Sequence, residues 1–128
     1  MLFEMEGDTE YKEVKLNGRY ALKINRVASS QDGNTAVIGL EVYEGPNEGE
    51  EVVGFLPMKF KPDADPRWIK RGTAFRNKFF KILDVDISEG SFDSNEITGK
   101  IIGATVTNRP NQNGVPTNQV SDWLPYEG

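Results

Sequence analysis

Apolar and polar residues alternate in five short segments of the chain, a pattern typical of strands that turn one face to a core. In the first segment, residues 18–27, Leu22 and Ile24 share one face. Val27 breaks this phase, which predicts a bulge near residues 25–26. The other predicted strands cover residues 35–43, 51–60, 99–109 and 118–124.

One segment has the period of a helix instead. Apolar side chains at positions 75, 79, 82 and 83 form a single stripe, which predicts a helix from Thr73 to about Leu83 with Thr73 as its N-cap. Residues 61–72 are expected to be irregular, with at most one helical turn opened by Pro66. Pro57 cannot donate to a strand ladder, so the third strand is expected to be an edge there or to end in a bulge.

The predicted order is three strands, one helix and two strands in a chain of 128 residues, which is the size of one domain. This order matches a mainly β fold with one helix, the five-stranded antiparallel OB-like barrel, whose faces and loops bind single strands or oligosaccharides. We expect an acidic N-terminal arm over residues 1–17, the OB-like domain over residues 18–125 and a short C-terminal end over residues 126–128.

The chain contains neither Cys nor His, which removes thiol nucleophiles, imidazole bases and most zinc sites. The carboxylate pairs Asp63 with Asp65 and Asp84 with Asp86 are the remaining candidates for a metal-dependent nuclease, but no general base stands at a recognisable spacing. We therefore expect no enzyme activity, no catalytic residue, no cofactor and no metal. No apolar run reaches the roughly 18 residues of a membrane span, so we expect no membrane partner and a cytoplasmic location.

Charge is strongly segregated in this chain. The net charge is −5, yet residues 58–82 hold eight Lys or Arg against two Asp, a local balance of +6. Aromatic residues are interleaved with these cations, a combination typical of single-strand nucleic-acid sites, although a solvated amphipathic helix would look the same. The expected phosphate contacts are Lys59, Lys61, Arg67, Lys70 and Arg71, and the expected stacking platforms are Phe60, Trp68 and Tyr43.

The loop at residues 110–117 adds further candidates. Arg109 stands at its base, and Asn111, Gln112 and Asn113 can hydrogen-bond base edges or phosphates, or serve only as turn residues. Phe60 can equally pack in the core, and Trp123 is expected to pack in the barrel.

The acidic residues suggest a second function. Glu41, Glu44, Glu48, Glu50 and Glu51 surround the second predicted hairpin. With the acidic arm they can imitate DNA phosphates, as in a protein-interaction module that inhibits a host defence complex. The arm can also compete with nucleic acid for the basic face. The strand edge near Pro57 leaves room for a homodimer.

Several short motifs resemble a known family. They are residues 18–20, residues 44–49, the helix sequence FRNKFFKIL, residues 97–100 and residues 117–120. Together they resemble a family of small tailed-phage proteins of unknown function, whose genes tend to lie near phage recombination and replication genes. The resemblance implies single-stranded-DNA binding in phage replication or recombination, phage or host replication and recombination proteins as partners, and the host bacterial cytoplasm as the location.

Overall fold

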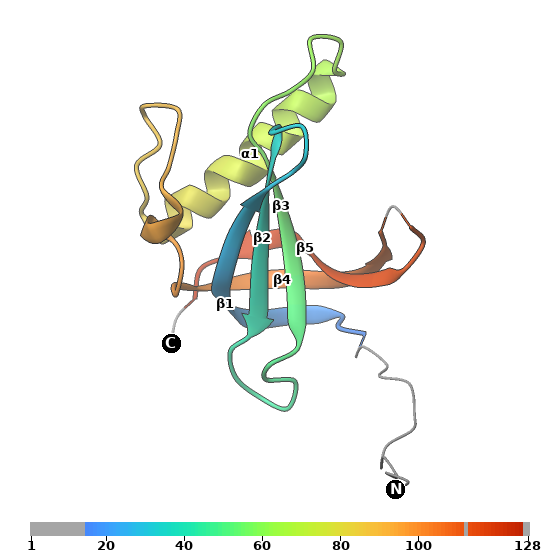
Figure 1. Ribbon diagram of the computed structural model, residues 1–128. Coiled ribbons are helices and arrows are strands. Elements are labelled where there is room, and N and C mark those ends of the chain that lie inside the picture. The colour runs from blue at the N-terminus through green and yellow to red at the C-terminus, as the bar shows by residue number, and fades with distance from the viewer. Residues whose placement is uncertain (1–14, 112, 127–128) are drawn as a thin grey trace, which may run out of the picture.

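The computed structural model describes residues 15–111 and 113–126, which form a closed β-barrel with one α-helix (Figure 1). The helix lies between the third and fourth strands in sequence, and a short 3-10 helix (η1) follows it. This arrangement confirms the predicted OB-like fold and its order of elements. The elements are β1 (Gly18–Ser29), β2 (Thr35–Val42), β3 (Glu51–Pro57), α1 (Pro66–Leu83), η1 (Ser94–Glu96), β4 (Ile101–Pro110) and β5 (Pro116–Leu124).

The strands neighbour one another in the order β1-β2-β3-β5-β4, and β1 closes the barrel by pairing with β4 as well as β2. The register between β1 and β2 shifts between Ile24 and Arg26, which confirms the bulge predicted from the phase break. Among the described residues, every strand pair is antiparallel except β3 with β5. That parallel pair has a single register match, Val53 with Gln119.

The helix begins at Pro66, and the predicted start at Thr73 was wrong. The Asp65 side chain accepts a hydrogen bond from the backbone N–H of Arg67 (2.8 Å), and Pro66 occupies the first turn, where its missing N–H costs nothing. Trp68 and Ile69 continue the apolar side of the helix into these first turns, but no residue of 66–72 joins the core. Gly72 lies inside the helix and not before it.

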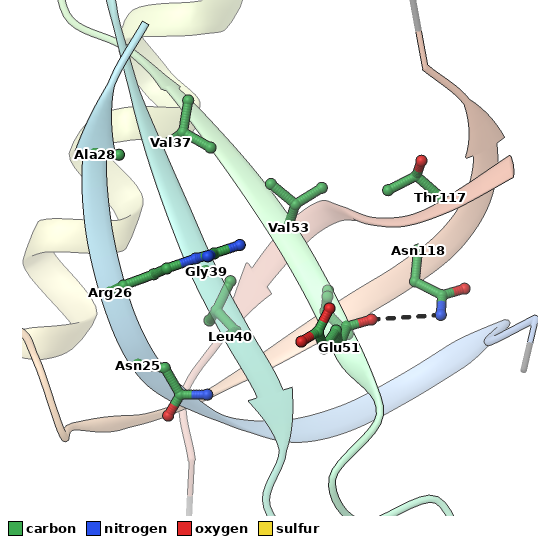
Figure 2. Close-up of a pocket in the computed structure, with 11 residues that line it drawn as sticks. Asn25, Arg26, Ala28, Val37, Gly39, Leu40, Glu51, Val53, Thr117 and Asn118 are labelled. Carbon is green, nitrogen blue, oxygen red and sulfur yellow. Dashed lines mark hydrogen bonds between the residues drawn. The ribbon is translucent and has the colours of Figure 1, made fainter. Parts of the chain in front are cut away.

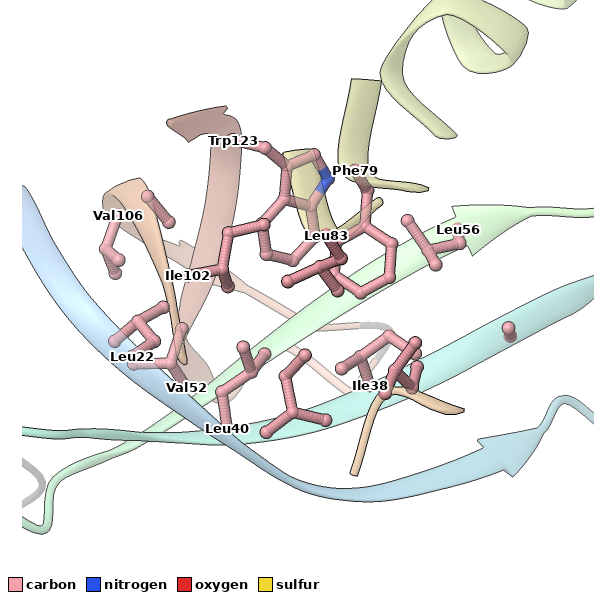
Figure 3. Packing of buried hydrophobic residues seen from close by; sticks show 14 of the residues in the cluster. Leu22, Ile38, Leu40, Val52, Leu56, Phe79, Leu83, Ile102, Val106 and Trp123 are labelled. Carbon is pink, nitrogen blue, oxygen red and sulfur yellow. The ribbon is translucent and has the colours of Figure 1, made fainter. Parts of the chain in front are cut away.

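The C-terminal half of α1 covers one end of the barrel, where it packs on the core shown in Figure 3. Phe79, Phe80 and Leu83 are buried there, and the ring centroids of Trp123 and Phe79 are 4.6 Å apart. A Cβ atom at Gly54 would lie only 2.7 Å from the Trp123 ring, so the glycine makes room for the indole. Trp123 is fully buried, as predicted.

A buried asparagine ties the start of the described chain to the barrel. Asn118, which is fully buried, accepts hydrogen bonds from the backbone N–H of Leu16 and from the side chain of Asn108, both at 2.9 Å. Leu16 is itself part of the core, so the packed domain already includes this residue. The acidic residues expected to form the arm lie in residues 1–14, outside the described residues.

Candidate nucleic-acid interface

The outer surface of β1, β2, β3 and β5, called here the barrel face, is built by the alternation of the strands. The residues Ala36, Ile38, Leu40, Val52 and Leu56 point into the core. The intervening residues point outward, and the register places Val37 beside Phe55 and Gly39 beside Val53. The Phe55 side chain is 43% exposed, so the face offers one aromatic ring to solvent.

Arg26 lies across this face because of the bulge and a glycine. The register shift turns Arg26 outward on β1, where its cross-strand partner is Gly39. A Cβ atom at position 39 would lie 2.6 Å from both Cγ and Nε of Arg26, so only glycine lets the arginine side chain lie over β2 (Figure 2). No hydrogen bond or ion pair recorded among the described residues uses the guanidinium of Arg26. Its positive charge is therefore available to a ligand.

Two hollows adjoin on this surface. The first, called the strand hollow, has a volume of about 380 Å³ and is lined by Arg26, Glu51, Val53 and Thr117 among others (Figure 2). The second, called the hairpin hollow, has a volume of about 540 Å³ and lies between β3 and the β4–β5 loop. Val53 lines one hollow and its register partner Gln119 lines the other, so the two hollows are neighbours at this pair and are together called the trough.

The loops that join β1 to β2 and β3 to α1 meet at one end of the barrel face. The backbone N–H groups of Met58 and Lys59 both donate to the carbonyl of Asn34, at 2.7 and 3.0 Å. A backbone hydrogen bond from Asn34 lowers the pKa of Asp32 most, and the charge of Lys61 adds a smaller contribution in the same direction. Lys59 and Lys61 are both exposed, so two cations stand at this end of the face.

The predicted residues Arg67, Trp68, Lys70 and Arg71, called here the helix cluster, occupy the first turns of α1. All four are exposed, and Trp68 is 63% exposed because the helix extends past the barrel. At 3.6 residues per turn, Lys70 points opposite the buried Phe79, Arg67 lies about 120° and Arg71 about 80° around the helix from it, and Trp68 lies on nearly the same side as Phe79. The cations of the cluster therefore spread over one flank and the far side of the helix, and Arg67 lies 3.8 Å from Asp65.

The structure separates the other predicted residues. Tyr43 follows the far end of β2 and meets the ring of Tyr126 edge-on, at 6.2 Å. The eight residues of β2 place it about 25 Å from the Lys59 end of the face. Phe60 is half-buried with its ring against Gly72 of α1, so it is largely engaged in packing. Arg109 is exposed at the end of β4, beside the hairpin hollow.

Three residues of the barrel face were missed by the sequence prediction: Arg26, Phe55 and Gln119. The signals were present, since the phase break at Val27 located the bulge and a mid-strand glycine stands at position 39. The alternation of β3 also places Phe55 outward, opposite to Leu56. The local charge of +6 over residues 58–82 pointed to the helix segment instead of the barrel face.

Three of the four carboxylates considered for a nuclease have structural roles. Asp65 caps α1, and Asp84 ends it in the left-handed conformation (φ 57°). The Asp86 side chain accepts a hydrogen bond from the backbone N–H of Ser88, which lowers the pKa of Asp86. Within residues 15–111 and 113–126, no group of three or more metal-ligating side chains is arranged to hold an ion. In the same part of the chain, no helix has both the length and the apolar character needed to cross a membrane.

Acidic side chains gather at the end of the barrel face opposite Lys59. Glu41 on β2 and Glu51 on β3 are directly opposed in the register. Glu44 and Glu48 are exposed in the loop between these strands. The charge of the face therefore changes from positive near the β1–β2 loop to negative near the β2–β3 loop.

No family model matches the chain, and no curated protein matches it in sequence. The functional conclusion rests on the geometry and charge of the barrel face.

Proposed function

We propose that this protein binds single-stranded DNA through the barrel face, largely without sequence specificity. The observation that carries the proposal is the unpaired Arg26 guanidinium, which lies over Gly39 within the trough that also holds the exposed Phe55 ring. A cation beside an aromatic surface matches the alternation of phosphate and base along a single strand.

Each part of the trough has a role in this proposal. Arg26, Lys59, Lys61 and Arg109 neutralise phosphates along the face and at its rim, and each contact releases counterions. Phe55 offers a stacking surface, an interaction worth about 1–3 kcal/mol per base. The helix cluster extends the positive potential past the β1–β2 loop end of the face.

The net charge of −5 is compatible with DNA binding because charges separated by more than about 8 Å are largely screened at physiological salt. The opposed Glu41 and Glu51 repel phosphates at the far end of β2 and β3. The strand is therefore expected to occupy the half of the face nearer Lys59 and the β4–β5 loop. A role in phage replication or recombination, in the host cytoplasm, is proposed on the sequence resemblance alone.

The test is a fluorescence-anisotropy titration with labelled oligothymidine at low and high salt. We expect micromolar or tighter binding at low salt that weakens steeply as salt rises. Arg26→Ala and Phe55→Ala should each weaken binding without unfolding the protein, since neither side chain is part of the core. Arg19→Ala is the matched control, because Arg19 is an exposed arginine of β1 that pairs with β4, away from the trough.

Absence of binding at low salt would refute the proposal. That result would instead favour a protein-interaction module that uses the acidic surface around residues 41–51.

A further inference from the structure

We infer that the hairpin hollow holds a single nucleobase of the bound strand and reads its edge. This inference rests on the proposed function. It adds that one site on the protein prefers some bases over others. The hollow combines the exposed ring of Phe55 with Pro110 and the side-chain amides of Asn111, Asn113 and Gln119. An aromatic plane supports a stacked base, and carboxamides offer both donors and acceptors to its edge.

The charges of the two hollows differ, which assigns them to different parts of a nucleotide. The strand hollow is lined by Arg26 and, toward the β2–β3 loop, by Glu51, so a phosphate fits only at its Arg26 side. The lining of the hairpin hollow contains neither a carboxylate nor a cation, so it suits a neutral group. Because the hollows adjoin at the Val53 and Gln119 pair, a phosphate on Arg26 and a base on Phe55 can belong to neighbouring nucleotides.

The amide of Asn111 is held in place by its own loop. Its Oδ1 accepts hydrogen bonds from the backbone N–H groups of Asn113 (2.9 Å) and Val115 (3.0 Å). The backbone of Asn111 is paired with that of Val115 as well, at 2.8 Å. With its oxygen occupied, Asn111 presents its NH₂ group as a positioned donor.

The amides of Asn113 and Gln119 complete the set. Gln119 lies on β5 next to Val53, at the boundary between the two hollows. None of the hydrogen bonds recorded among the described residues uses the side-chain amide of Asn113 or Gln119. These groups are therefore free to distinguish bases by their pattern of donors and acceptors. Gln112 lies outside the described residues and has no part in this inference.

The experiment compares the affinities of homo-oligomers of thymidine, deoxycytidine and deoxyadenosine, each of about 12 nucleotides, the size range of one OB-fold site. Homo-oligomers present the same base in every register, so sliding cannot hide a preference. We expect dissociation constants that differ by about fivefold or more between the best and worst base, as one edge contact provides. The variant Asn113→Ala/Gln119→Ala should reduce that spread to about twofold or less.

Asn95→Ala is the matched control, since Asn95 is an exposed asparagine in η1, outside both hollows, and the spread should persist in it. Equal affinities for the three oligomers in the unmodified protein would overturn the base-reading inference and leave single-strand binding intact. A spread of undiminished size in the double variant would also overturn it, because the amides of Asn113 and Gln119 would then not be reading the base. Absence of binding to any oligomer would overturn the inference together with the proposed function.

Discussion

A single methyl group at position 39 should displace the arginine on which the proposed function rests. In Gly39→Ala the new Cβ atom would lie 2.6 Å from Cγ and Nε of Arg26, closer than atoms approach in proteins. The exposed arginine can swing away, so the strand itself is not strained. The backbone at Gly39 is outside the left-handed region, and alanine in a strand is favoured over glycine by about 0.5–1 kcal/mol. We therefore expect unchanged or slightly increased thermal stability.

Binding should weaken by about the value of one charge-assisted contact, about 1.5 kcal/mol, or roughly tenfold. The assay is the anisotropy titration with labelled oligothymidine, repeated over a series of salt concentrations. A plot of log binding constant against log salt concentration has a negative slope. Loss of one phosphate contact should make that slope shallower by about 0.7, the value per contact for a single strand.

The mechanism is tested by combining Gly39→Ala with Arg26→Ala. If the methyl group acts only by moving the guanidinium, Gly39→Ala will have no further effect once Arg26 is alanine. Unchanged affinity in the single variant Gly39→Ala would refute the reasoning. An equal loss in the presence and absence of Arg26 would refute it too, because the methyl group would then obstruct the strand directly.

Three further predictions concern the barrel. Gly54→Ala should destabilise the protein by about 1–3 kcal/mol in a denaturant titration, because the new methyl group overpacks the buried Trp123 ring, 2.7 Å away; wild-type stability would contradict this. Asn118→Ala should cost about 1–3 kcal/mol in the same measurement, because the N–H of Leu16 loses its acceptor in a buried site. Asp32→Asn should lower the melting temperature at neutral pH. The pKa of Asp32 is lowered from 3.8, chiefly by a backbone hydrogen bond in its loop, so its contribution is present above that value and is lost as the pH falls through the lowered pKa. A melting-temperature difference from wild type that did not shrink below pH 3.8 would contradict the last prediction.

The barrel could be predicted from the sequence because its signals are local and repeat along each strand. The inward residues of β2, such as Ile38 and Leu40, follow the period of two and are buried as expected. The bulge on β1 was visible because Val27 falls out of phase. The parallel β3–β5 pair was not visible, since it joins residues far apart in the chain with a single match.

The candidate site was predicted less well because charge along a helix does not report where each side chain points. Lys59 and Lys61 do lie at the barrel face, but the cations of the helix cluster lie on the flank and far side of α1. The start of α1 was placed too late because residues 66–72 add nothing to the core, and Gly72 interrupts the helical pattern. Arg26 acquires its position only from a partner 13 positions later, Gly39, and that pairing requires the register of β1 and β2.

The parallel match between Val53 and Gln119 is the shortest ladder in the described barrel, and both hollows lie along it. A strand pair that is held by few backbone hydrogen bonds separates at a lower free energy than the neighbouring strand pairs. The barrel is therefore expected to open most easily between β3 and β5, directly beneath the proposed ligand. Amide hydrogen exchange along β3 and β5 should consequently slow on ligand binding more than exchange along β1 and β4.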